Sequence, residues 1–571
     1  MEVLMAGKVA VGIQSFDTLI EKQYFYIDKT SFIREWWGCG DAVTLIARPR
    51  RFGKTLNMSM TEQFFSVEYK NRADLFQKFA VWKDPEYRKL QGTYPVISLS
   101  FANVKERDYV STRTRICQLI TDLYQKYRYV RDGADMMEAD REFFDSVRVD
   151  MPETIATIAL YKLCDYLYRY YGKKVIILLD EYDTPMQEAW ICGFWEELTA
   201  FCRSMFNAAF KTNPWLERGL MTGITRISKE SIFSDLNNLK IITTTSDEYA
   251  DSFGFTEKEV FAALEECGLE QEKEAVKWWY DGFTFGTHKD IYNPWSILNF
   301  LDTGKYAPYW ANTSSNSLVG KLIQEGNTQL KESFESLLRG ESICSAIDEQ
   351  IVYTQLNGNE RAVWSLLLAS GYLKIVSVKN VREIPYGAQP KYELALTNLE
   401  VKMMFENMVR DWFAPAEADY NKFVAALLNG ELDAMNGYMN RVALQVFSYF
   451  DTGAGTAMEE PERFYHGFVL GMIVELQDRY IITSNRESGF GRYDVMFEPR
   501  SVSDPAFILE FKVKNSAKES ALSDTVQSAL AQIEEKQYDA MLLQRGIPKE
   551  RIHCYGFAFQ GRNVLIGTNE K

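Results

Sequence analysis

The chain has 571 residues and a mass of 66.0 kDa, and its 46% apolar and 25% charged residues are typical of a folded globular protein, which excludes dominant disorder. Its formal net charge of −15 excludes a protein that coats nucleic acid through a generally basic surface. Between positions 461 and 571 there are 14 basic and 15 acidic residues, so nearly all of the negative excess lies in the first 460 residues. The length predicts about three or four domains.

Histidine and cysteine usage narrows the kinds of metal site. There are three histidines and eight cysteines, and no C-x-x-C pair occurs. This indicates free thiols in a reducing compartment, and any metal is expected to be a hard cation held by carboxylates. The first residues lack a signal-peptide pattern, and no uncharged apolar run approaches the ~18 residues of a membrane span. We therefore expect a cytoplasmic protein with no membrane partner.

The first third of the chain alternates strand-like and helix-like segments. Apolar, β-rich runs occur at 43–47, 94–100, 175–179 and 219–224, with helical patterns such as 109–129 and 154–171 between them. Buried strands separated by helices predict a parallel sheet covered on both faces, so the predicted class is α/β.

The pattern changes after about residue 240. A capping box, Thr256 to Glu259, opens an amphipathic helix, and residues 318–450 are mainly helical. Within them, 362–371 and 396–413 bracket a candidate winged-helix unit. The best linker is 451–456, after which an α/β alternation returns. Aromatic residues in the 278–295 region can stack on bases, but we favour core packing: Trp278, Trp279, Tyr292 and Trp295.

A phosphate-binding candidate follows the first strand. Residues 48–55 read R-P-R-R-F-G-K-T and lead into a helix, so they end in the G-K-[ST] of a P-loop, with Arg48 where the first glycine is usual. Backbone N–H groups at such a helix start cradle phosphates, while Lys54 would reach the β- and γ-phosphates and Thr55 would bind Mg²⁺. The residues expected to bind ATP are Arg50, Arg51, Phe52, Gly53, Lys54 and Thr55.

A second strand supplies the acidic half of this site. The apolar run 175–179 ends in Asp180 and Glu181, the Walker B arrangement, in which Asp180 holds Mg²⁺ through water and Glu181 polarises the attacking water. The alternative is a buried strand followed by a solvated acidic turn. Just past the run 219–224, Thr225 is placed to sense the γ-phosphate, and Arg226 either offsets transition-state charge or satisfies an acidic neighbour.

A carboxylate and lysine constellation lies near the C-terminus. Strand patterns occur at 480–484, 492–497 and 506–513, and alternation puts Glu510 and Lys512 on one face with Asp494 on the neighbouring strand. Two charged residues inside an apolar strand are costly unless paired or metal-bound. Asp494 and Glu510 would bind Mg²⁺ and Lys512 would orient or deprotonate the nucleophile in phosphodiester hydrolysis. An ion pair on an edge strand is the alternative.

Two further residues are candidates for this second site. The helix predicted at 524–535 carries Gln532, which can join the site from downstream. Glu462 lies upstream, just before a predicted helix, and is expected as an additional metal ligand.

The residues resemble a bacterial family that joins an AAA-type ATPase-like domain to a C-terminal PD-(D/E)XK nuclease-like domain, over nearly the whole chain. In that family R-P-R-R-F-G-K-[ST] is the usual form of the loop, which accounts for the missing glycine. The resemblance implies ATP binding and a nuclease fold, and Tyr493 stands where the family pattern has proline. The matching segments are 26–30, 48–55, 179–183, 222–228, 280–282, 292–295, 464–467 and the set Asp494, Glu510 and Lys512.

The resemblance and the patterns together predict four regions. They are a P-loop ATPase core over 1–240, a helical lid over 241–317, a mainly helical linker domain over 318–455 and a restriction-endonuclease-like α/β domain over 456–571. The expected cofactors are ATP and Mg²⁺, and the expected partners are DNA or RNA and a second copy of the chain.

Three functions remain open at the level of sequence. The first is an ATP-dependent nuclease or nucleic-acid remodeller, with Glu181, Asp494, Glu510 and Lys512 as its catalytic residues. The second is a nucleotide-gated signalling or assembly switch whose nuclease-like domain only binds a partner. The third is a structural or interaction protein with degenerate sites.

Overall fold

The computed structural model describes most of the chain, and the chain divides into two compact units. The first unit comprises residues 1–314, 345–392 and 397–400, and the second comprises 315–344, 393–396 and 401–571. The described residues are 7–226, 232–233, 236–311, 317–349, 355–356, 359–378, 390–450, 460–485, 487–488, 491–492, 494–501, 503–515 and 518–569. The predicted linker at 451–456 lies outside them. No helix in these ranges combines the length and the apolarity needed to cross a membrane.

The first unit is built on a parallel sheet, as the apolar runs predict. Its five strands have the order β2-β3-β4-β1-β5, so β4 lies between the strand that precedes the 48–55 loop and the strand that ends at Asp180. All six residues of β3 are buried, which explains its unbroken apolar sequence. The strands are β1 (Val43–Ala47), β2 (Val96–Ser100), β3 (Val175–Asp180), β4 (Leu216–Gly223) and β5 (Leu239–Ile242).

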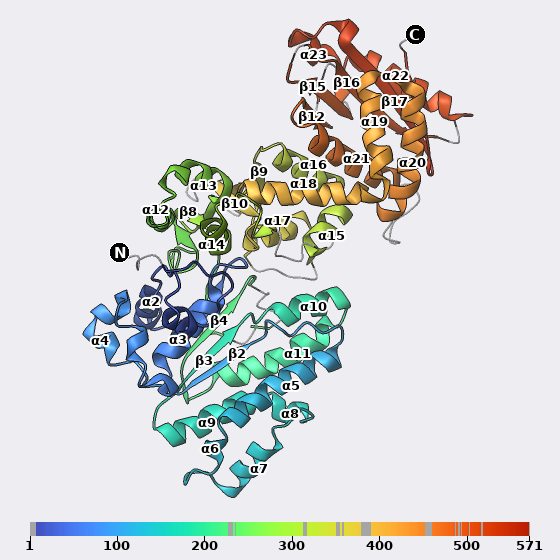
Figure 1. Ribbon diagram of the computed structural model, residues 1–571. Helices are drawn as coiled ribbons and strands as arrows, with labels where there is room; N and C mark the ends of the chain where they lie inside the picture. Colours follow the sequence, from blue (N-terminus) through green and yellow to red (C-terminus); the bar gives the residue numbers. More distant parts are fainter. Residues whose placement is uncertain are drawn as a thin grey trace. The chain divides into compact units, whose positions relative to one another are not determined.

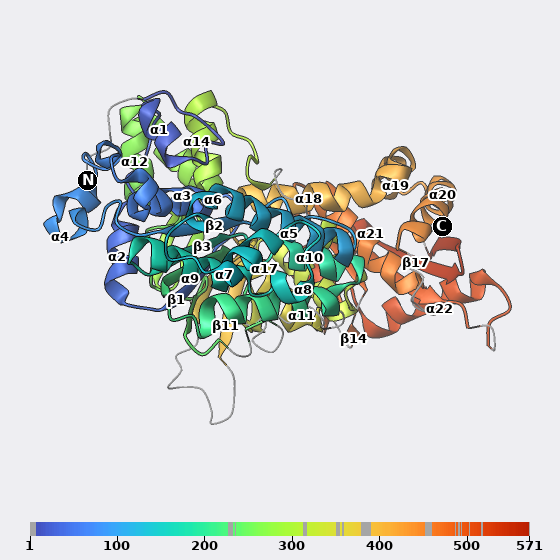
Figure 2. The same ribbon diagram turned by 90° about the horizontal axis from the view of Figure 1, so that it is seen from below.

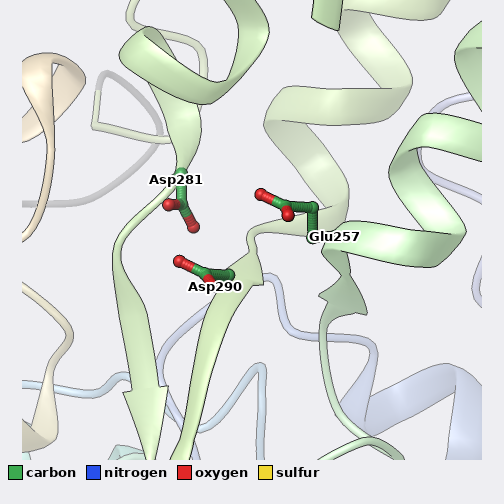
Figure 3. Close-up of side chains that lie close together, drawn as sticks. All are labelled: Glu257, Asp281 and Asp290. Atoms are coloured by element: carbon green, nitrogen blue, oxygen red, sulfur yellow. The ribbon is translucent and has the colours of Figure 1, made fainter. Parts of the chain in front are cut away.

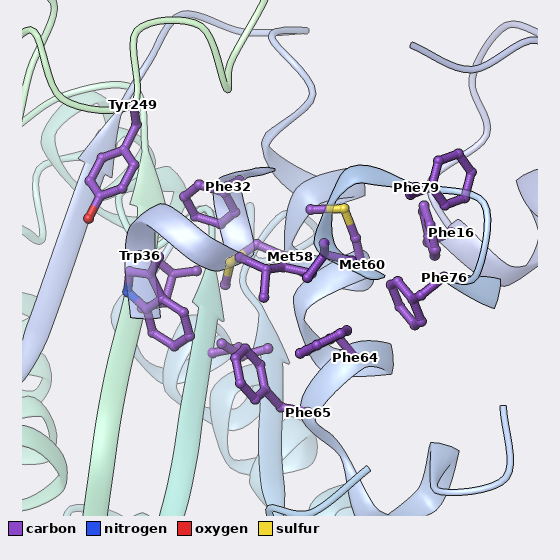
Figure 4. Packing of buried hydrophobic residues seen from close by; sticks show 14 of the residues in the cluster. Phe16, Phe32, Trp36, Met58, Met60, Phe64, Phe65, Phe76, Phe79 and Tyr249 are labelled. Carbon is purple, nitrogen blue, oxygen red and sulfur yellow. The ribbon is translucent and has the colours of Figure 1, made fainter. Parts of the chain in front are cut away.

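Helices cover both faces of this sheet. Figure 1 shows α5, α9 and α11 on the opposite side of the sheet from α2 and α3. The core beneath α2 and α3 is rich in aromatic and methionine side chains, among them Trp36, Met58 and Phe64 (Figure 4). The helices of this region are α1 (Phe16–Glu21), α2 (Ser31–Cys39), α3 (Lys54–Phe65), α4 (Pro85–Arg88), α5 (Tyr109–Lys126), α6 (Arg128–Arg131), α7 (Glu138–Ser146), α8 (Glu153–Ala156), α9 (Ala159–Tyr171), α10 (Thr184–Cys192) and α11 (Trp195–Phe206).

A smaller antiparallel sheet and three helices complete this part of the first unit. The sheet has the order β6-β8-β7, and the predicted capping box at Thr256 and Glu259 is formed at the start of α12. Helices α12 and α14 pack against the N-terminal segment through Val260, Phe300 and Ile27, and they gather beside that segment in Figure 2. The elements are β6 (Phe255–Thr256), α12 (Glu257–Glu266), α13 (Lys273–Tyr280), β7 (Phe283–Phe285), β8 (His288–Tyr292) and α14 (Pro294–Thr303).

Helices and short strands follow in the middle of the chain. The two segments predicted to bracket a winged-helix unit form α17 (Glu360–Ala369) and α18 (Leu399–Phe413), with β10 (Leu373–Val378) and β11 (Lys391–Leu396) between them. The other elements here are α15 (Ser317–Glu325), α16 (Thr328–Leu338), β9 (Ile343–Ala346), α19 (Glu417–Asn429) and α20 (Leu432–Phe450).

The second unit carries the C-terminal α/β alternation. Its sheet has the order β12-β15-β16-β17-β18, antiparallel except for the parallel pair β16 and β17. Helix α22 packs on β16, β17 and β18, and Figure 1 shows these elements in orange and red. The elements are α21 (Glu460–Leu476), β12 (Tyr480–Ser484), β13 (Glu487–Ser488), β14 (Gly491–Arg492), β15 (Val495–Pro499), β16 (Ala506–Val513), α22 (Leu522–Lys536), α23 (Ala540–Gln544), β17 (Ile552–Gln560) and β18 (Asn563–Thr568).

Candidate nucleotide and nuclease sites

The 48–55 loop connects β1 to the first turn of α3, which begins at Lys54. Gly53 has φ +79°, a conformation that favours glycine, and an added Cβ there would meet nothing within 4 Å. The Lys54 side chain is buried and its Nζ donates to the carbonyl oxygens of Arg48 (2.9 Å) and Pro49 (2.8 Å). Burial lowers the pKa of Lys54, while the charges of Glu181, Asp180 and Asp183 oppose that shift.

Thr55, in the first turn of α3, and Asp180, at the end of β3, lie in contact at one edge of the sheet. The Thr55 hydroxyl donates to Oδ2 of Asp180 at 2.7 Å, and the Thr222 hydroxyl, from β4, donates to Oδ1. Burial raises the pKa of Asp180, and both hydroxyl contacts oppose the rise. A hydroxyl and a carboxylate in contact at a helix start have the chemistry that binds Mg²⁺ together with phosphate oxygens.

Glu181 and Asp183 have different environments. Glu181 has φ +51°, and its carboxylate accepts from the Thr184 hydroxyl at 3.2 Å. Asp183 is buried and its Oδ2 accepts from the backbone N–H of Ile224 and from both the N–H and the hydroxyl of Thr225, each at 2.9 Å. The Thr225 hydroxyl is therefore directed to Asp183.

The close approach of β4 to this turn depends on Gly223. A Cβ at Gly223 would lie 2.7 Å from the Tyr182 ring and 2.8 Å from Oδ1 of Asp183. Any side chain at position 223 would therefore displace the acidic turn.

Arg48 occupies the position at which the first glycine of a P-loop is usual, and its side chain is accommodated in the protein interior. Its side chain is fully buried, turns away from the loop and donates to the carbonyl oxygens of Thr243, Ala47 and Glu248. The guanidinium also stacks 4.3 Å from the centroid of the Phe285 ring. Arg48 thus stabilises the loop, and no local pattern indicates this role because its partners Thr243 and Glu248 lie 195 and 200 positions away.

The remaining loop residues point in several directions. Arg50 Nη2 donates to Gln187 Oε1 at 3.3 Å, and the Arg51 guanidinium stacks 4.2 Å from the centroid of the Trp295 ring. The Phe52 side chain is buried against the rings of Phe283 and Phe285, so only its backbone is available to a nucleotide.

Arg226 has the acidic neighbour that the alternative interpretation predicts. Its Nη1 lies 4.0 Å from Glu349 Oε2, at the limit of an ion pair. Arg226 and Glu349 line a small cavity beside the end of β1 that Ala47 and Thr243 also line.

The aromatic stretch packs in the core only in part: Tyr292 is buried, Trp279 and Trp295 are half-buried, and Trp278 is exposed. Tyr292 is fully buried, and Trp279 stacks on Tyr306 with ring centroids 5.6 Å apart. Trp278 differs, because it is 67% exposed; its position on α13 turns it away from the cluster that buries Val276 and Tyr280.

One acidic cluster of the first unit was not singled out in the sequence. Within the described ranges, Glu257, Asp281 and Asp290 are the group of three whose ligand atoms all lie within 4.8 Å of one another (Figure 3). Burial and a hydrogen bond with Asp290 raise the pKa of Asp281 to about 7. Lys277 pairs with Glu257, so this cluster is partly compensated by a positive charge.

In the second unit, the three nuclease candidates meet at the end of β16. Asp494 stands immediately before β15, not within a strand as the pattern suggested. Its backbone carbonyl accepts from Asn485 N–H (3.0 Å) and the Tyr465 hydroxyl (2.8 Å). Its Oδ2 accepts from Phe511 N–H at 2.7 Å. Burial raises the pKa of the Asp494 carboxyl, and the charge of Lys512 opposes the rise.

Gln532 of α22 forms hydrogen bonds with both Glu510 and Lys512. Glu510 is 3% exposed, its Oε1 accepts from Gln532 Nε2, and its Oε2 has no hydrogen-bond partner. Lys512 Nζ donates to Gln532 Oε1 at 2.7 Å, so Glu510 and Lys512 share a face as strand alternation predicts. Burial and the neighbouring Asp494 charge raise the pKa of Glu510.

A buried carboxylate oxygen without a donor has the chemistry to accept a cation. Glu510 Oε2 and the Asp494 carboxylate are hard oxygen ligands, which fits Mg²⁺ or Mn²⁺. Glu462, the other expected ligand, lies in α21, but the structure describes only its backbone, so its predicted role as a ligand is not tested. The sequence patterns did not predict a role for Tyr465, which lies in the matched segment 464–467 and donates to the Asp494 carbonyl.

Comparisons with known proteins agree with this division of the chain. Residues 10–233 match a family model described as predicted AAA-ATPase, and residues 460–569 match a model described as the PD-(D/E)XK nuclease superfamily. A curated relative from Azotobacter chroococcum mcd 1, described as an uncharacterized protein in the vnfD 5' region, is 25% identical over 568 residues. That match covers 97% of this chain and 96% of the relative.

Proposed function

We propose that this chain, which has an AAA-ATPase-like domain over residues 10–233 and a PD-(D/E)XK nuclease superfamily domain over residues 460–569, hydrolyses ATP with Mg²⁺ and cleaves nucleic acid. The observation that carries the first activity is the contact of Thr55 with Asp180 at 2.7 Å beside the buried Lys54. The observation that carries the second is the convergence of Asp494, Glu510 and Lys512 at the end of one strand.

The nucleotide would be held mainly by the loop and the start of α3. Backbone N–H groups at the α3 N-terminus would donate to phosphate oxygens, and Lys54 would exchange its carbonyl partners for the β- and γ-phosphates. Thr55 and Asp180 would hold Mg²⁺, which offsets the phosphate charge. Glu181 is the residue proposed to orient and deprotonate the attacking water.

The second site would act on a phosphodiester. Asp494 and Glu510 would hold Mg²⁺ or Mn²⁺, which would lower the pKa of a bound water and offset charge on the reacting phosphate. Gln532 fixes Lys512 and Glu510 relative to each other, and Lys512 is left to orient the nucleophilic water or its proton. DNA and RNA present the same phosphodiester chemistry, so both belong in the assay.

Three substitutions separate the two activities. Lys54→Ala should abolish ATP binding and hydrolysis measured by calorimetry and phosphate release, whereas Glu181→Gln should retain binding and lose hydrolysis. Glu510→Gln should abolish Mg²⁺-dependent cleavage of labelled DNA and RNA while ATP hydrolysis persists. Absence of cleavage of any DNA or RNA by a wild-type chain that hydrolyses ATP would contradict the nuclease assignment.

The assembly switch makes a different prediction. If the nuclease-like domain only binds a partner, an ATP-dependent change in oligomeric state would persist in Glu510→Ala, with no cleavage in either protein. Light scattering with and without ATP distinguishes this outcome from the proposed activity.

A further inference from the structure

Helix α16 approaches the nuclease site from outside the segment that matches the nuclease family. It spans Thr328–Leu338, belongs to the second unit, and lies far upstream of residue 460 in the chain. Glu335 Oε2 accepts from the Ser484 hydroxyl, and Glu332 Oε1 accepts from Asn485 Nδ2 at 2.6 Å. Both bonds therefore reach the end of β12.

The end of β12 is directly connected to Asp494. Ser484 is paired with Val495 across the sheet, and the Asn485 backbone N–H donates to the Asp494 carbonyl at 3.0 Å. The Tyr465 hydroxyl donates to the same carbonyl at 2.8 Å. The Asp494 backbone is thus held by Tyr465 and by the end of β12, and α16 is bonded to the end of β12 through Ser484 and Asn485.

Glu335 also faces His466 in the protein interior. The side chains of Glu335 and His466 are 1% and 2% exposed, and Glu335 Oε1 lies 3.7 Å from His466 Nδ1. Neither atom has a hydrogen-bond partner, and 3.7 Å is longer than a hydrogen bond. Unpartnered buried polar atoms are costly, so a facing pair of this kind indicates that the two groups close on each other in the working site.

Carboxylates of α16 and of the proposed metal site all act electrostatically on the Tyr465 hydroxyl. The pKa of the buried Tyr465 hydroxyl is raised by burial and then by the charges of Asp494, Glu335, Glu332 and Glu510. His466 in turn lowers the pKa of Asp494. The α16 carboxylates therefore act on the same small region as the proposed metal ligands.

We propose that Glu335 is a positioning residue of the nuclease site, which orients His466 through Nδ1 and holds the end of β12 that places Asp494. The inference rests on the proposed nuclease function, and it assigns α16 to that site although α16 lies outside the family segment. Residues that orient metal ligands in this way commonly change metal affinity by about 10- to 100-fold when removed.

Mn²⁺ titration of the full-length chain tests the proposal, with calorimetry as the readout. Glu335→Ala should weaken Mn²⁺ binding at the Asp494 and Glu510 site about 10- to 100-fold. Glu335→Gln keeps an acceptor for Ser484 but loses the charge that faces His466, so it should fall between the wild type and Glu335→Ala. Glu325→Gln, on α15, is the matched control and should leave the affinity unchanged.

A double-mutant cycle separates positioning from general destabilisation. If Glu335 acts through His466, Glu335→Gln should cost little in a His466→Asn background, so that the two effects are not additive. ATP affinity of each variant should remain that of the wild type, and Mn²⁺ affinities are compared at a temperature at which thermal unfolding shows every variant to be folded, because loss of the buried Glu335 acceptor lowers stability. Additive effects, or wild-type Mn²⁺ affinity in a folded Glu335→Ala chain, would overturn the proposal.

The outcomes distinguish this inference from the proposed function. A wild-type chain that binds Mn²⁺, loses affinity in Glu335→Ala and yet cleaves neither DNA nor RNA would support the positioning role and contradict the nuclease activity. Cleavage with the same Mn²⁺ dependence in the wild type and in Glu335→Ala would support the nuclease activity and contradict the positioning role.

Discussion

At the scale of single residues, Arg48 shows how a buried cation replaces a glycine. Arg48→Ala would leave the carbonyl oxygens of Thr243 and Glu248 without their donor and would open a cavity under Phe285. Because hydrogen bonds from a charged donor contribute about 1.5–3 kcal/mol each, we expect the free energy of unfolding of the first unit to fall by about 3 kcal/mol or more. Denaturant unfolding monitored with and without ATP measures the loss.

Arg51→Ala is the matched control for Arg48. Arg51 is exposed and its guanidinium only stacks on Trp295, so its removal should cost about 0.5–1 kcal/mol. Arg48→Gly restores the usual glycine of the pattern, but it should lose stability like Arg48→Ala. Equal stability of Arg48→Gly and the wild type would contradict the stabilising role of Arg48.

The raised carboxyl pKa values of the nuclease site predict a pH dependence. Burial and the Asp494 charge raise the pKa of Glu510 from its ordinary value of 4.5, so without metal the folded state binds this proton more tightly than the unfolded state does. Stability of the second unit should therefore fall as the pH rises from 4.5 through the raised pKa. Mg²⁺ affinity should rise over the same range, because protons compete with the metal.

The Glu510→Gln variant tests both the predicted fall in stability and the predicted rise in Mg²⁺ affinity with increasing pH. It should flatten the metal-free stability profile, measured by thermal unfolding across pH, and it should remove most of the stabilisation by Mg²⁺. Glu535→Gln, on the same unit, is the control, since the Glu535 side chain is 77% exposed. A profile for Glu510→Gln as steep as that of the wild type would show that other groups cause the dependence.

At the scale of elements, strands and capped helix starts are predicted well because their signals are local. The buried run of β3 and the strand β12 lie where the apolar patterns place them, and the Thr256 capping box is formed. The helix expected at 154–171 is divided into α8 and α9, because β-branched residues such as Ile155, Thr157 and Ile158 weaken helix formation at its start.

The parts of the sites that sequence patterns did not predict depend on distant partners. Arg48 reaches the 243–248 segment, and Glu335 reaches Ser484 149 positions away. No periodicity links such residues, so only the fold brings them together. By contrast, sequence motifs at strand ends predict Lys54, Thr55 and Asp180. The topology of a parallel sheet brings such strand ends together at one edge.

The loop that carries Lys54 is also held by an element outside the main sheet. The Arg50 carbonyl accepts from Trp310 Nε1 (3.0 Å) and Asn293 Nδ2 (3.2 Å). Trp310→Phe keeps a ring against Phe283 but removes this donor, so we expect ATP affinity to fall about 5- to 10-fold, the equivalent of one hydrogen bond of about 1 kcal/mol. Calorimetric titration of ATP measures the change.

Trp278→Phe is the control for Trp310→Phe. Trp278 is 67% exposed, so this variant alters a tryptophan of the same unit without touching the loop. Trp310 is buried, so Trp310→Phe should also unfold at a lower temperature than Trp278→Phe, and the ATP affinities are compared in folded chains. Unchanged ATP affinity in a folded Trp310→Phe chain would show that Asn293 alone suffices to hold the loop.

At the scale of the whole molecule, the two proposed ligand sites lie in separate units that share one helix. Residues 399 and 400 at the start of α18 belong to the first unit, and the rest of α18 belongs to the second. Glu400 is buried and accepts from the backbone N–H of Trp310 and from the Ser296 hydroxyl. The Arg50 carbonyl, Trp310 and Glu400 therefore form a continuous series of contacts from the nucleotide loop to the first turn of α18.

This arrangement predicts which amides each ligand protects from hydrogen exchange. A ligand at 100 times its dissociation constant stabilises the state that binds it by about 2.7 kcal/mol, and the effect is largest where the contacts are made. ATP with Mg²⁺ should slow exchange in α3, at the end of β3, around Trp310 and in the first turn of α18. Mn²⁺ alone should slow exchange in β15, β16 and α22.

Substitutions test which contacts cause each pattern of exchange protection. Lys54→Ala should abolish only the ATP pattern and Glu510→Gln only the Mn²⁺ pattern, because their contacts lie in different units. Glu400→Gln keeps an acceptor for Trp310 N–H, so it should retain the ATP effect on α18, whereas Glu400→Ala should retain protection of α3 but lose protection of the first turn of α18. If Glu400→Ala leaves the α18 response unchanged, the contact through Trp310 is not the route by which nucleotide binding reaches that helix.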